Sequence, residues 1–313
     1  MKYAIYKLHF STGVHIGNRD LADGEYAINS DTIFSALCHE ALKAGGEQYI
    51  NKLISLVNDN LILISDALPF IEDELYIPKP LQPIDNVDNN QNQGDSINKK
   101  AFKKLKYISI DMLDTYMEGN LDPETELEIF KDLGGSEVRT QAWINGTEET
   151  KPYFIGVYNF KANNGLYIIV AYKDKDDLNF IENLIQALGY TGIGGRRSSG
   201  LGKFKPELNT LSDEFINHLN DDLYQDYMTL SSCMAKESEL GNIIEDSYYL
   251  LHKRSGFVSS RNYSEGSLKK RDFYAFKAGS CFSNKFNGDI FDVSYKGNHP
   301  VYRYAKPMFL GVK

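Results

Sequence analysis

The sequence predicts an α+β protein built from two units, each with the element order βαββαβ. The first ten residues alternate apolar and polar side chains as a strand does, and a helical pattern follows Ser30–Asp31. Two later apolar runs, a second helical pattern and a glycine-rich segment complete this order, and the last third holds further short runs rich in Tyr, Phe and Val. We therefore expect two ferredoxin-like (RRM-like) units, at 1–207 and, in degenerate form, at 208–313.

The first unit opens with a strand at 2–10, because apolar side chains alternate with others there. The Ser30–Asp31 pair is placed to cap the helix that follows, and Gly45–Gly46 is placed to end it. A second helix is expected at 47–58. Residues 61–84 are expected to form short strands, because prolines interrupt this stretch four times.

The same unit resumes with strands at 153–160 and 165–172, which a turn at Asn163–Gly165 is predicted to join into a hairpin. A helix at 176–188 follows, since its apolar side chains recur at helical spacing on one face. A strand at 203–206 then closes the unit.

Residues 85–150 are predicted to be an insertion rather than core, because their charges are segregated and their apolar periodicity is poor. The segment opens with the polar, low-complexity stretch DNVDNNQNQG at 85–94. Five lysines follow at 99–106, and nine acids with one base follow at 111–137.

The second unit is predicted to begin after Pro206 and the polar stretch at 209–213. Residues 208–246 are expected to be an acidic, helix-rich connection. The remainder is expected to be mostly strands, at 247–252, 255–260, 273–276, 289–295 and 300–312.

The composition is that of a globular chain that does not cross a membrane. Hydrophobic residues make up 42% of the 313 residues and charged residues 25%. No apolar run reaches the length of about 18 residues that a transmembrane helix needs, and the first residues lack an apolar signal segment. Cys38, Cys233 and Cys281 lie far apart without a CxxC pair. We therefore expect a cytoplasmic protein without a disulfide framework or a zinc knuckle.

The charge distribution leaves room for a nucleic-acid partner despite a net charge of −9. Residues 111–137 and 211–246 each hold nine acids and one base, so together they contribute −16 and leave about +7 on the rest of the chain. Bases gather at 99–106, 196–205 and 253–271. Since the local field decides where a polyanion binds, these clusters could hold RNA, although each could also be an ordinary solvated surface.

The glycine-rich segment at 189–202 is the most specific feature of the sequence. It holds six glycines, which allow positive φ and close backbone approach, together with Arg196, Arg197, Ser198 and Ser199. Guanidinium groups, hydroxyls and exposed N–H groups favour phosphate oxygens. The segment leads into a strand and lacks the GxxxxGK[ST] pattern, so it is not a P-loop. The alternative is a tight helix-to-strand connection that needs small residues.

This loop, GIGGRRSSGLGKF, resembles the glycine-rich loop of the RAMP superfamily, the RNA-binding proteins of CRISPR systems. Other segments agree with one family within it. These segments are His15–Gly17, Ser30–Leu37, Tyr76–Pro80, Tyr249–Phe257, Tyr274–Ser280 and Tyr304–Pro307. Together they resemble the fourth Csm-type subunit of type III-A CRISPR effector complexes, over both halves of the chain and most weakly at 85–150.

The resemblance implies an RNA-binding structural subunit that grips the 5′ repeat-derived tag of the CRISPR RNA and functions in antiviral defence. It implies as partners the CRISPR RNA, nearby target RNA, the large Palm-domain subunit and the RAMP subunit of the backbone. It implies no catalysis, no metal and no cofactor. Residues 85–150 resemble the thumb region that projects against the guide–target duplex.

The candidate RNA-binding residues combine the glycine loop, the bases beside it and several rings. They are His15, Gly17, Lys79, Arg139, Trp143, Gly194, Gly195, Arg196, Arg197, Ser198, Ser199, Lys203, Lys253, Arg254, Ser255 and Phe257. Rings of this kind stack on splayed bases, and Tyr263 is a further candidate plane. For each ring the alternative is packing in the core.

Two other functions stay open at this point. The first is a metal-independent endoribonuclease that processes CRISPR RNA, in which His9 or His15 would supply acid–base chemistry. The second is a protein-interaction scaffold without direct RNA contact. No paired acid–base partner for either histidine stands out by its spacing in the sequence.

Overall fold

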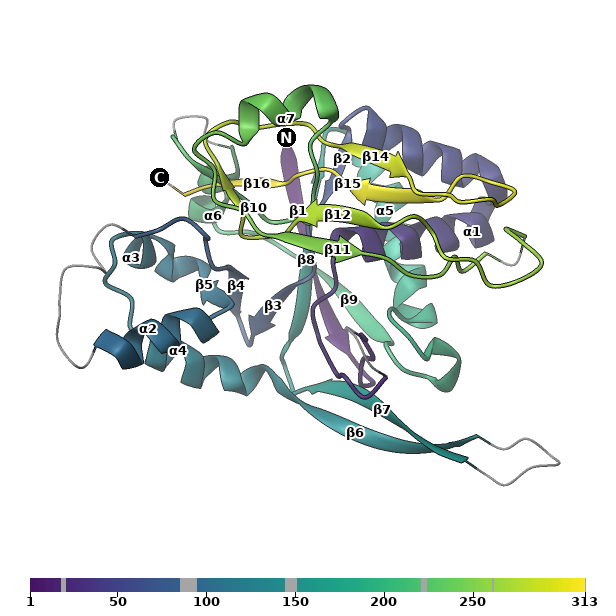
Figure 1. Ribbon diagram of the computed structural model, residues 1–313, viewed down its shortest axis with the longest axis horizontal. Helices are drawn as coiled ribbons and strands as arrows, with labels where there is room; N and C mark the ends of the chain where they lie inside the picture. Colours follow the sequence, from purple (N-terminus) through teal and green to yellow (C-terminus); the bar gives the residue numbers. More distant parts are fainter. Residues whose placement is uncertain (18–20, 85–94, 144–150, 221–223, 261, 313) are drawn as a thin grey trace.

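The computed structural model describes residues 1–313 except 18–20, 85–94, 144–150, 221–223, 261 and 313. Its largest sheet has the strand order β5-β4-β3-β8-β1-β9, and β2 also pairs with β8 (Figure 1). The bounds are β1 Lys2–Phe10, β2 Ile62–Ile64, β3 Leu68–Ile71, β4 Glu74–Pro78, β5 Tyr107–Ser109, β8 Gly165–Tyr172 and β9 Phe204–Asn209. Every pairing in this sheet is antiparallel.

The sheet is covered on both faces, which explains why residues 4–8 of the central strand β1 are all buried. Tyr6 and Leu8 pack on one face with α1, Ser30–Asn58, and α5, Lys175–Thr191. Ile5 belongs to a second core on the opposite face. Alternate side chains of a strand point to opposite faces, so one strand contributes to two cores.

The two long helices follow the predicted pattern. α1 spans both predicted helices as one kinked element, because Gly45 and Gly46 leave helical geometry and Gly46 has a φ of 64°. α5 begins after Asp174, whose side chain accepts a hydrogen bond from the Asp176 N–H. The strand predicted at 2–10 and the helix predicted at 176–188 are therefore confirmed.

The predicted insertion is more ordered and more closely packed than its charge pattern indicates. It forms α2 Asp95–Lys104, β5, α3 Leu113–Met117 and α4 Pro123–Phe130, and then the first strand of a hairpin. Apolar residues of this segment that belong to the second core include Leu105, Ile108, Leu113, Tyr116 and Leu121. The prediction of an insertion rather than core is therefore wrong for these residues, because α3, β5 and the connections beside the helices bury their side chains without a long periodic run.

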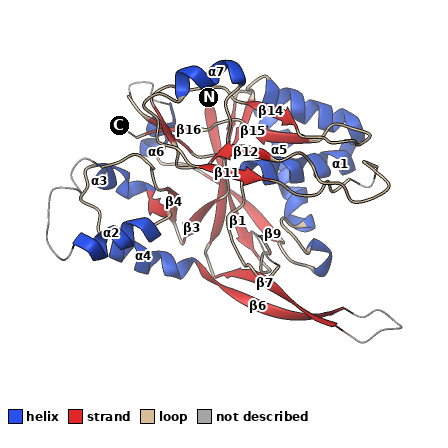
Figure 2. Cartoon of the chain, viewed as in Figure 1, coloured by secondary structure: helices blue, strands red, loops and turns tan. Residues whose placement is uncertain are grey.

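The hairpin consists of β6, Gly134–Trp143, and β7, Lys151–Phe160, and it extends away from the body of the protein (Figure 2). The predicted hairpin of 153–160 with 165–172 is wrong, since β7 pairs with β6 over ten residues. β8 is already paired with β1 on one edge and with β2 and β3 on the other. The base of β7 instead contacts the loop after β1, through the bridge between Val14 and Tyr158.

The C-terminal half consists of short pieces around small sheets rather than one further sheet. Its helices are α6 Asp213–Asn220 and α7 Glu237–Ile243. Its strands are β10 Tyr227–Thr229, β11 Leu251–Arg254, β12 Phe273–Phe276, β13 Cys281–Phe282, β14 Asp289–Asp292, β15 Tyr302–Ala305 and β16 Phe309–Gly311. They pair as β13-β10-β16, β11-β12 and β14-β15.

Several strand predictions in this half need correction. The strand predicted at 255–260 is wrong, because these residues form only an isolated bridge between Phe257 and Lys269. The strand predicted at 300–312 is divided into β15 and β16 around Pro307, whose missing N–H interrupts a ladder. The strand predicted at 289–295 ends at Asp292, and the connection at 208–246 contains β10 as well as helices.

The two halves share their cores and their buried hydrogen bonds. Tyr304 packs beside Phe34 of α1, and its hydroxyl accepts a hydrogen bond from the Ile64 N–H at 2.8 Å. The buried carboxylate of Asp66 accepts hydrogen bonds from the N–H groups of Ser30 and Ser232, both at 2.7 Å. Among the described helices, none combines the length and the apolar composition that crossing a membrane requires.

Candidate nucleic-acid interface

The glycine-rich loop connects α5 to β9 and depends on backbone conformations that side chains resist. Gly194 and Gly202 have φ of 92° and 76°. A Cβ on Gly202 would lie 1.9 Å from the Ile193 carbonyl oxygen. Arg196 also adopts positive φ, and its guanidinium lies 5.1 Å from the Tyr153 ring centroid on the hairpin. The glycines therefore set the path of the loop, which determines the direction of the two arginines.

His15 lies beneath this loop. Its carbonyl oxygen accepts a hydrogen bond from the Gly195 N–H at 2.9 Å, and its ring Nδ1 lies 2.7 Å from the Gly156 carbonyl oxygen. Because a carbonyl only accepts, Nδ1 must carry the proton. The residue is 6% exposed. The ring therefore supports the loop from below rather than presenting a face to RNA.

A pocket of about 210 Å³ opens between the loop, the N-terminal turn of α1 and the C-terminal half. We call it the cationic pocket. It brings together four of the predicted residues, Gly194, Arg197, Arg254 and Ser255, with His39, Lys270 and Arg303. Four of these side chains are bases, and the acid that lines the pocket is Asp31.

Asp31 is shared by two arginines. Its carboxylate lies 2.7 Å from Arg254 Nη2 and 3.0 Å from Arg254 Nε, and it also contacts Arg303 Nη1. Burial alone would raise the pKa of Asp31, but Arg254 and then Arg303 hold that pKa below its usual value. One carboxylate thus balances one of the bases, and the pocket keeps a net positive charge.

Two features show that the bases of the cationic pocket lack enough acceptors and negative charge around them. Arg303 is 5% exposed, and its Nε and Nη2 have no hydrogen-bond partner among the described residues. Burial, together with Arg303 and Arg254, lowers the pKa of Lys270 to about 8. Buried donors without partners are costly, so this arrangement favours an anionic ligand with several acceptor oxygens.

A groove of about 450 Å³ is also lined by Arg254, and we call it the basic groove. It brings together the predicted residues Gly17, Lys79 and Arg254. Further basic side chains along it are Lys103, Lys106, His252 and Lys277. Burial lowers the pKa of Lys79, whose Nζ donates to the Phe102 carbonyl oxygen. Asp66 also lines the groove, but its carboxylate already accepts the hydrogen bonds from Ser30 and Ser232 described above.

The hairpin carries one predicted residue whose side chain is described. Arg139 of β6 is partly exposed and forms an ion pair with Glu137 at 2.5 Å. Trp143 ends β6, but its side chain lies outside the described residues. Exposed apolar side chains also occur here, with Val138 60% and Phe154 55% exposed.

The remaining candidates are divided between exposed and buried positions. Lys203, Ser198 and Ser199 are exposed on the loop. Lys253 is exposed but paired with Asp272 at 2.6 Å. Phe257 is 56% exposed, with Lys269 Nζ 5.6 Å from its ring centroid. The suggestion that Tyr263 offers a stacking plane is wrong, because this residue is 1% exposed.

Lys270, Arg303 and His39 were not among the predicted site residues. Lys270 belongs to a basic run at 269–271, which was noted only as a cluster, and Arg303 lies within an otherwise apolar strand. His39 is on α1, about two and a half turns after Ser30 at the N-terminus of the helix. His39 is separated from Lys270 and Arg303 by more than 200 residues along the chain. Spacing in the sequence therefore could not predict that these side chains lie together.

The described residues also contain one set of side chains that could hold a metal ion. The ligand atoms of Asp114, Glu214 and His218 lie within 4.8 Å of one another. His218 Nδ1 lies 2.9 Å from the Gly311 carbonyl oxygen, and both carboxylates are exposed. The set lies on α3 and α6, away from the glycine loop (Figure 1). Exposed acids often gather without an ion, so this set carries no assignment.

Comparison with known protein families agrees with this geometry. A model of the RAMP superfamily matches residues 7–205, which is more than half of the chain, and so defines the class of protein. A model of the CRISPR Csm4 C-terminal domain matches residues 223–312. The CRISPR system Cms protein Csm4 of Mycobacterium tuberculosis is 33% identical over 314 residues, covering 100% of this chain and 98% of that protein. The chain therefore belongs to the Csm4 family of the RAMP superfamily.

Other relatives cover the chain equally well. Csm4 of Streptococcus thermophilus is 29% identical over 313 residues, covering 99% of this chain and 98% of that protein. A chain of the crystal structure of the Csm3–Csm4 subcomplex in the type III-A CRISPR–Cas interference complex has a TM-score of 0.68 at 21% identity, covering 100% of both chains. A chain of the Csm1–Csm4 cassette in complex with cA4 has a TM-score of 0.66 at 17% identity, covering 100% and 98%. These likenesses show that the fold is shared.

Proposed function

We propose that this chain is an RNA-binding structural subunit of a type III-A CRISPR interference complex and grips the 5′ repeat-derived tag of the CRISPR RNA. The observation that carries the proposal is the cationic pocket beside the glycine loop. Four bases face one acid there, and two buried nitrogens of Arg303 have no hydrogen-bond partner in the part of the chain that the structure describes. A phosphate supplies negative charge and several acceptor oxygens, which is what such a set of donors lacks.

The path of the RNA follows from the other features. The basic groove lies beside the cationic pocket and shares Arg254 with it, so a strand that leaves one can enter the other. Basic grooves that track a backbone are typical of single-strand binding. We assign Gly17 and Lys79 to this path, and Arg139 and Trp143 on the hairpin to nearby guide and target RNA. We assign His15 to holding the glycine loop in place.

The same proposal includes a place within an assembly. The solved relatives were crystallised with Csm3 or with Csm1, which supports a position between the backbone subunit and the large Palm-domain subunit. The order β3-β8-β1-β9 with α1 and α5 on one face supports a ferredoxin-like first unit. We place the boundary to a degenerate second unit near residue 207, as the family matches at 7–205 and 223–312 support.

A second candidate function is metal-independent RNA processing, and one observation favours it. His39 lines the cationic pocket, and burial, followed by Arg197 and Lys43, lowers the pKa of its ring. A neutral imidazole beside a bound phosphate can act as a general base. His9 is less suited, because it lies on β1 near Glu207 and outside this pocket. We favour the binding role, because the pocket offers four cationic donors for a phosphate but only one imidazole ring for acid–base chemistry.

The test compares RNA binding by the full chain and by two charge variants. Arg197→Met removes a base that lines the pocket, whereas Lys175→Met removes an exposed base at the start of α5, about 25 Å along the helix from the loop. We expect Arg197→Met to lose tag affinity and Lys175→Met to keep it. Equal affinities for all three proteins would contradict the proposal. RNA cleavage that persists in EDTA and disappears in His39→Ala would favour the second candidate instead.

A further inference from the structure

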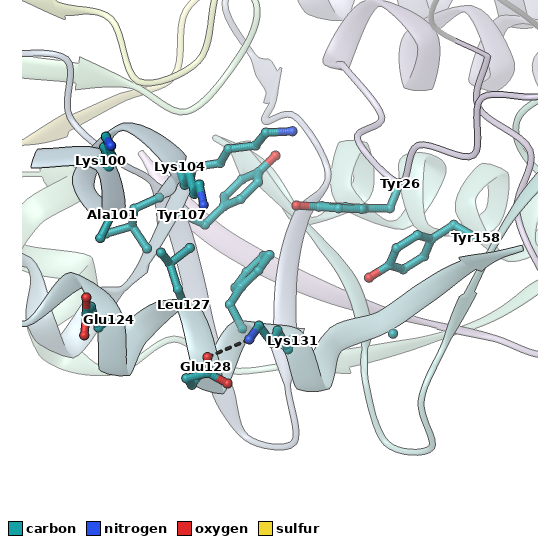
Figure 3. Close-up of a pocket in the computed structure, with 14 residues that line it drawn as sticks. Tyr26, Lys100, Ala101, Lys104, Tyr107, Glu124, Leu127, Glu128, Lys131 and Tyr158 are labelled. Carbon is teal, nitrogen blue, oxygen red and sulfur yellow. Dashed lines mark hydrogen bonds and ion pairs between the residues drawn. The ribbon is translucent and has the colours of Figure 1, made fainter. Parts of the chain in front are cut away.

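A pocket of about 760 Å³ lies between the loop before α1, helices α2 and α4, and the base of the hairpin (Figure 3). We call it the aromatic pocket, because the rings of Tyr26, Tyr107, Phe130 and Tyr158 line it. Its volume falls within the range of about 300–1,000 Å³ that small organic ligands occupy in proteins.

The rings are arranged around Tyr26. Its centroid lies 4.8 Å from that of Tyr158 and 6.2 Å from those of Tyr107 and Phe130. Tyr107 and Phe130 are stacked at 5.6 Å with an interplanar angle of 11°. Figure 3 shows Tyr26, Tyr107 and Tyr158 converging on one gap from three segments of the chain. The four rings give the pocket flat apolar walls.

Lysines line the same pocket. Lys100, Lys104 and Lys106 come from α2 and the residues just after it. Lys131 forms an ion pair with Glu128 at 2.6 Å, so these two charges offset each other. Glu124 remains as the acid opposite the three other lysines. The pocket therefore combines aromatic walls with a net positive charge.

The aromatic pocket is continuous with the basic groove. Tyr26, Leu105, Lys106 and Tyr107 line both. A ligand in the groove can therefore place one of its groups among the rings without leaving the lysines. This continuity ties the pocket to the polyanion that the groove is proposed to hold.

We propose that the aromatic pocket takes one unstacked nucleobase of the RNA strand that lies in the basic groove, with the adjoining phosphate held by the lysines of α2. This inference rests on the proposed RNA-binding function and adds a base site to it. Flat π-faces and a cationic rim match a nucleotide, because every base has a π-face and carries a phosphate beside it. The net positive charge that Lys100, Lys104 and Lys106 leave against Glu124 favours a nucleotide over an aromatic side chain of a protein partner.

The experiment scans the tag RNA with abasic and 2-aminopurine substitutions, one position at a time, and measures binding to the full chain. We expect one position at which the abasic sugar weakens binding roughly 5- to 150-fold, the loss that base–aromatic stacking predicts. 2-Aminopurine at that position should be quenched when the wild-type chain binds. If the scan finds no such position, the inference is overturned. This part of the test uses the wild-type chain alone.

Variants then locate the base. Tyr107→Leu should remove the abasic penalty and the quenching at that position, whereas Tyr107→Phe should keep both. Tyr49→Leu, which removes a half-exposed ring on α1, is the control and should behave as wild type. A Tyr107→Leu profile identical to wild type overturns the inference while RNA binding stands. Loss of a partner subunit with an unchanged RNA profile would assign the pocket to protein. Failure of the wild-type chain to bind RNA at all would remove the proposed function itself.

Discussion

Affinity for RNA at the cationic pocket is expected to fall as the pH rises through about 8. Lys270 has a pKa of about 8 because of burial and of the positive charges on Arg303 and Arg254. A bound phosphate would supply the missing negative charge and return this pKa toward its ordinary value of about 10.4. Above the free-state pKa, binding must first add a proton, so alkaline pH weakens binding and acidic pH does not.

The size of this effect follows from the two pKa values. With about 8 in the free protein and about 10.4 in the complex, proton linkage gives roughly a 25-fold loss of affinity between about pH 7 and pH 9.5. Asp31, Arg254, Arg303, His39 and Arg197 also line this pocket. The arginines do not titrate in this range, and His39 and Asp31 lose their protons at lower pH, so Lys270 dominates.

The assay is fluorescence anisotropy of a labelled tag RNA across this pH range at constant ionic strength. Lys270→Arg keeps the charge without titrating and should flatten the dependence, while Lys270→Met should flatten it and weaken binding at neutral pH. These two variants separate Lys270 from every other group that titrates near pH 8. The same pH slope in wild type and Lys270→Arg would refute the reasoning.

Three further outcomes are expected. Replacing Arg196 and Arg197 together by alanine should reduce the salt dependence of tag binding by roughly 1.4 in log–log slope, at about 0.7 per phosphate contact with a single strand; an unchanged slope in a filter-binding titration would exclude both contacts. Asp31→Asn should lower the free energy of unfolding in urea by about 3–5 kcal/mol, since it leaves the buried guanidinium of Arg303 and the partly buried guanidinium of Arg254 without their shared carboxylate. A loss below about 1 kcal/mol would show that this ion pair is not buried in solution. Gly202→Ala should destabilise the chain by about 1–3 kcal/mol because of its positive φ and close contact, whereas Gly135→Ala, with nothing within 4 Å, should be neutral in the same thermal melts.

Local patterns in the sequence predicted the elements whose causes are local. The alternation at 2–10, the helical spacing at 176–188 and the glycines at 45–46 each determine the conformation of their own segment. The glycine loop was likewise predictable, because few other residues tolerate its φ angles. The pairing of β7 was not, because the choice between β6 and β8 depends on which edges of β8 are already occupied.

The residues of the candidate site likewise include some that local sequence patterns predicted and some that they did not. Arg197 and Arg254 were selected from basic runs, and the structure places both on the cationic pocket. Arg303 was missed, because a lone base in a strand of Tyr and Ala is indistinguishable from a surface residue until its burial is known. His15 was predicted to bind RNA, and the structure buries its ring beneath the glycine loop, where it fills the space that Gly194 and Gly195 leave.

The hydrogen bonds that join Asp66 to Ser232 and Ile64 to Tyr304 affect how the chain is made on the ribosome. Residue 207 leaves the exit tunnel well before residue 303, and at translation rates of about 5–20 residues per second the delay is roughly 5–20 s. During that interval one face of the main sheet lacks Met228 and Leu310, which later cover it. One apolar face of the sheet in the nascent N-terminal half is therefore exposed to solvent during this interval. Folding should then depend on chaperones or on early contact with a partner subunit.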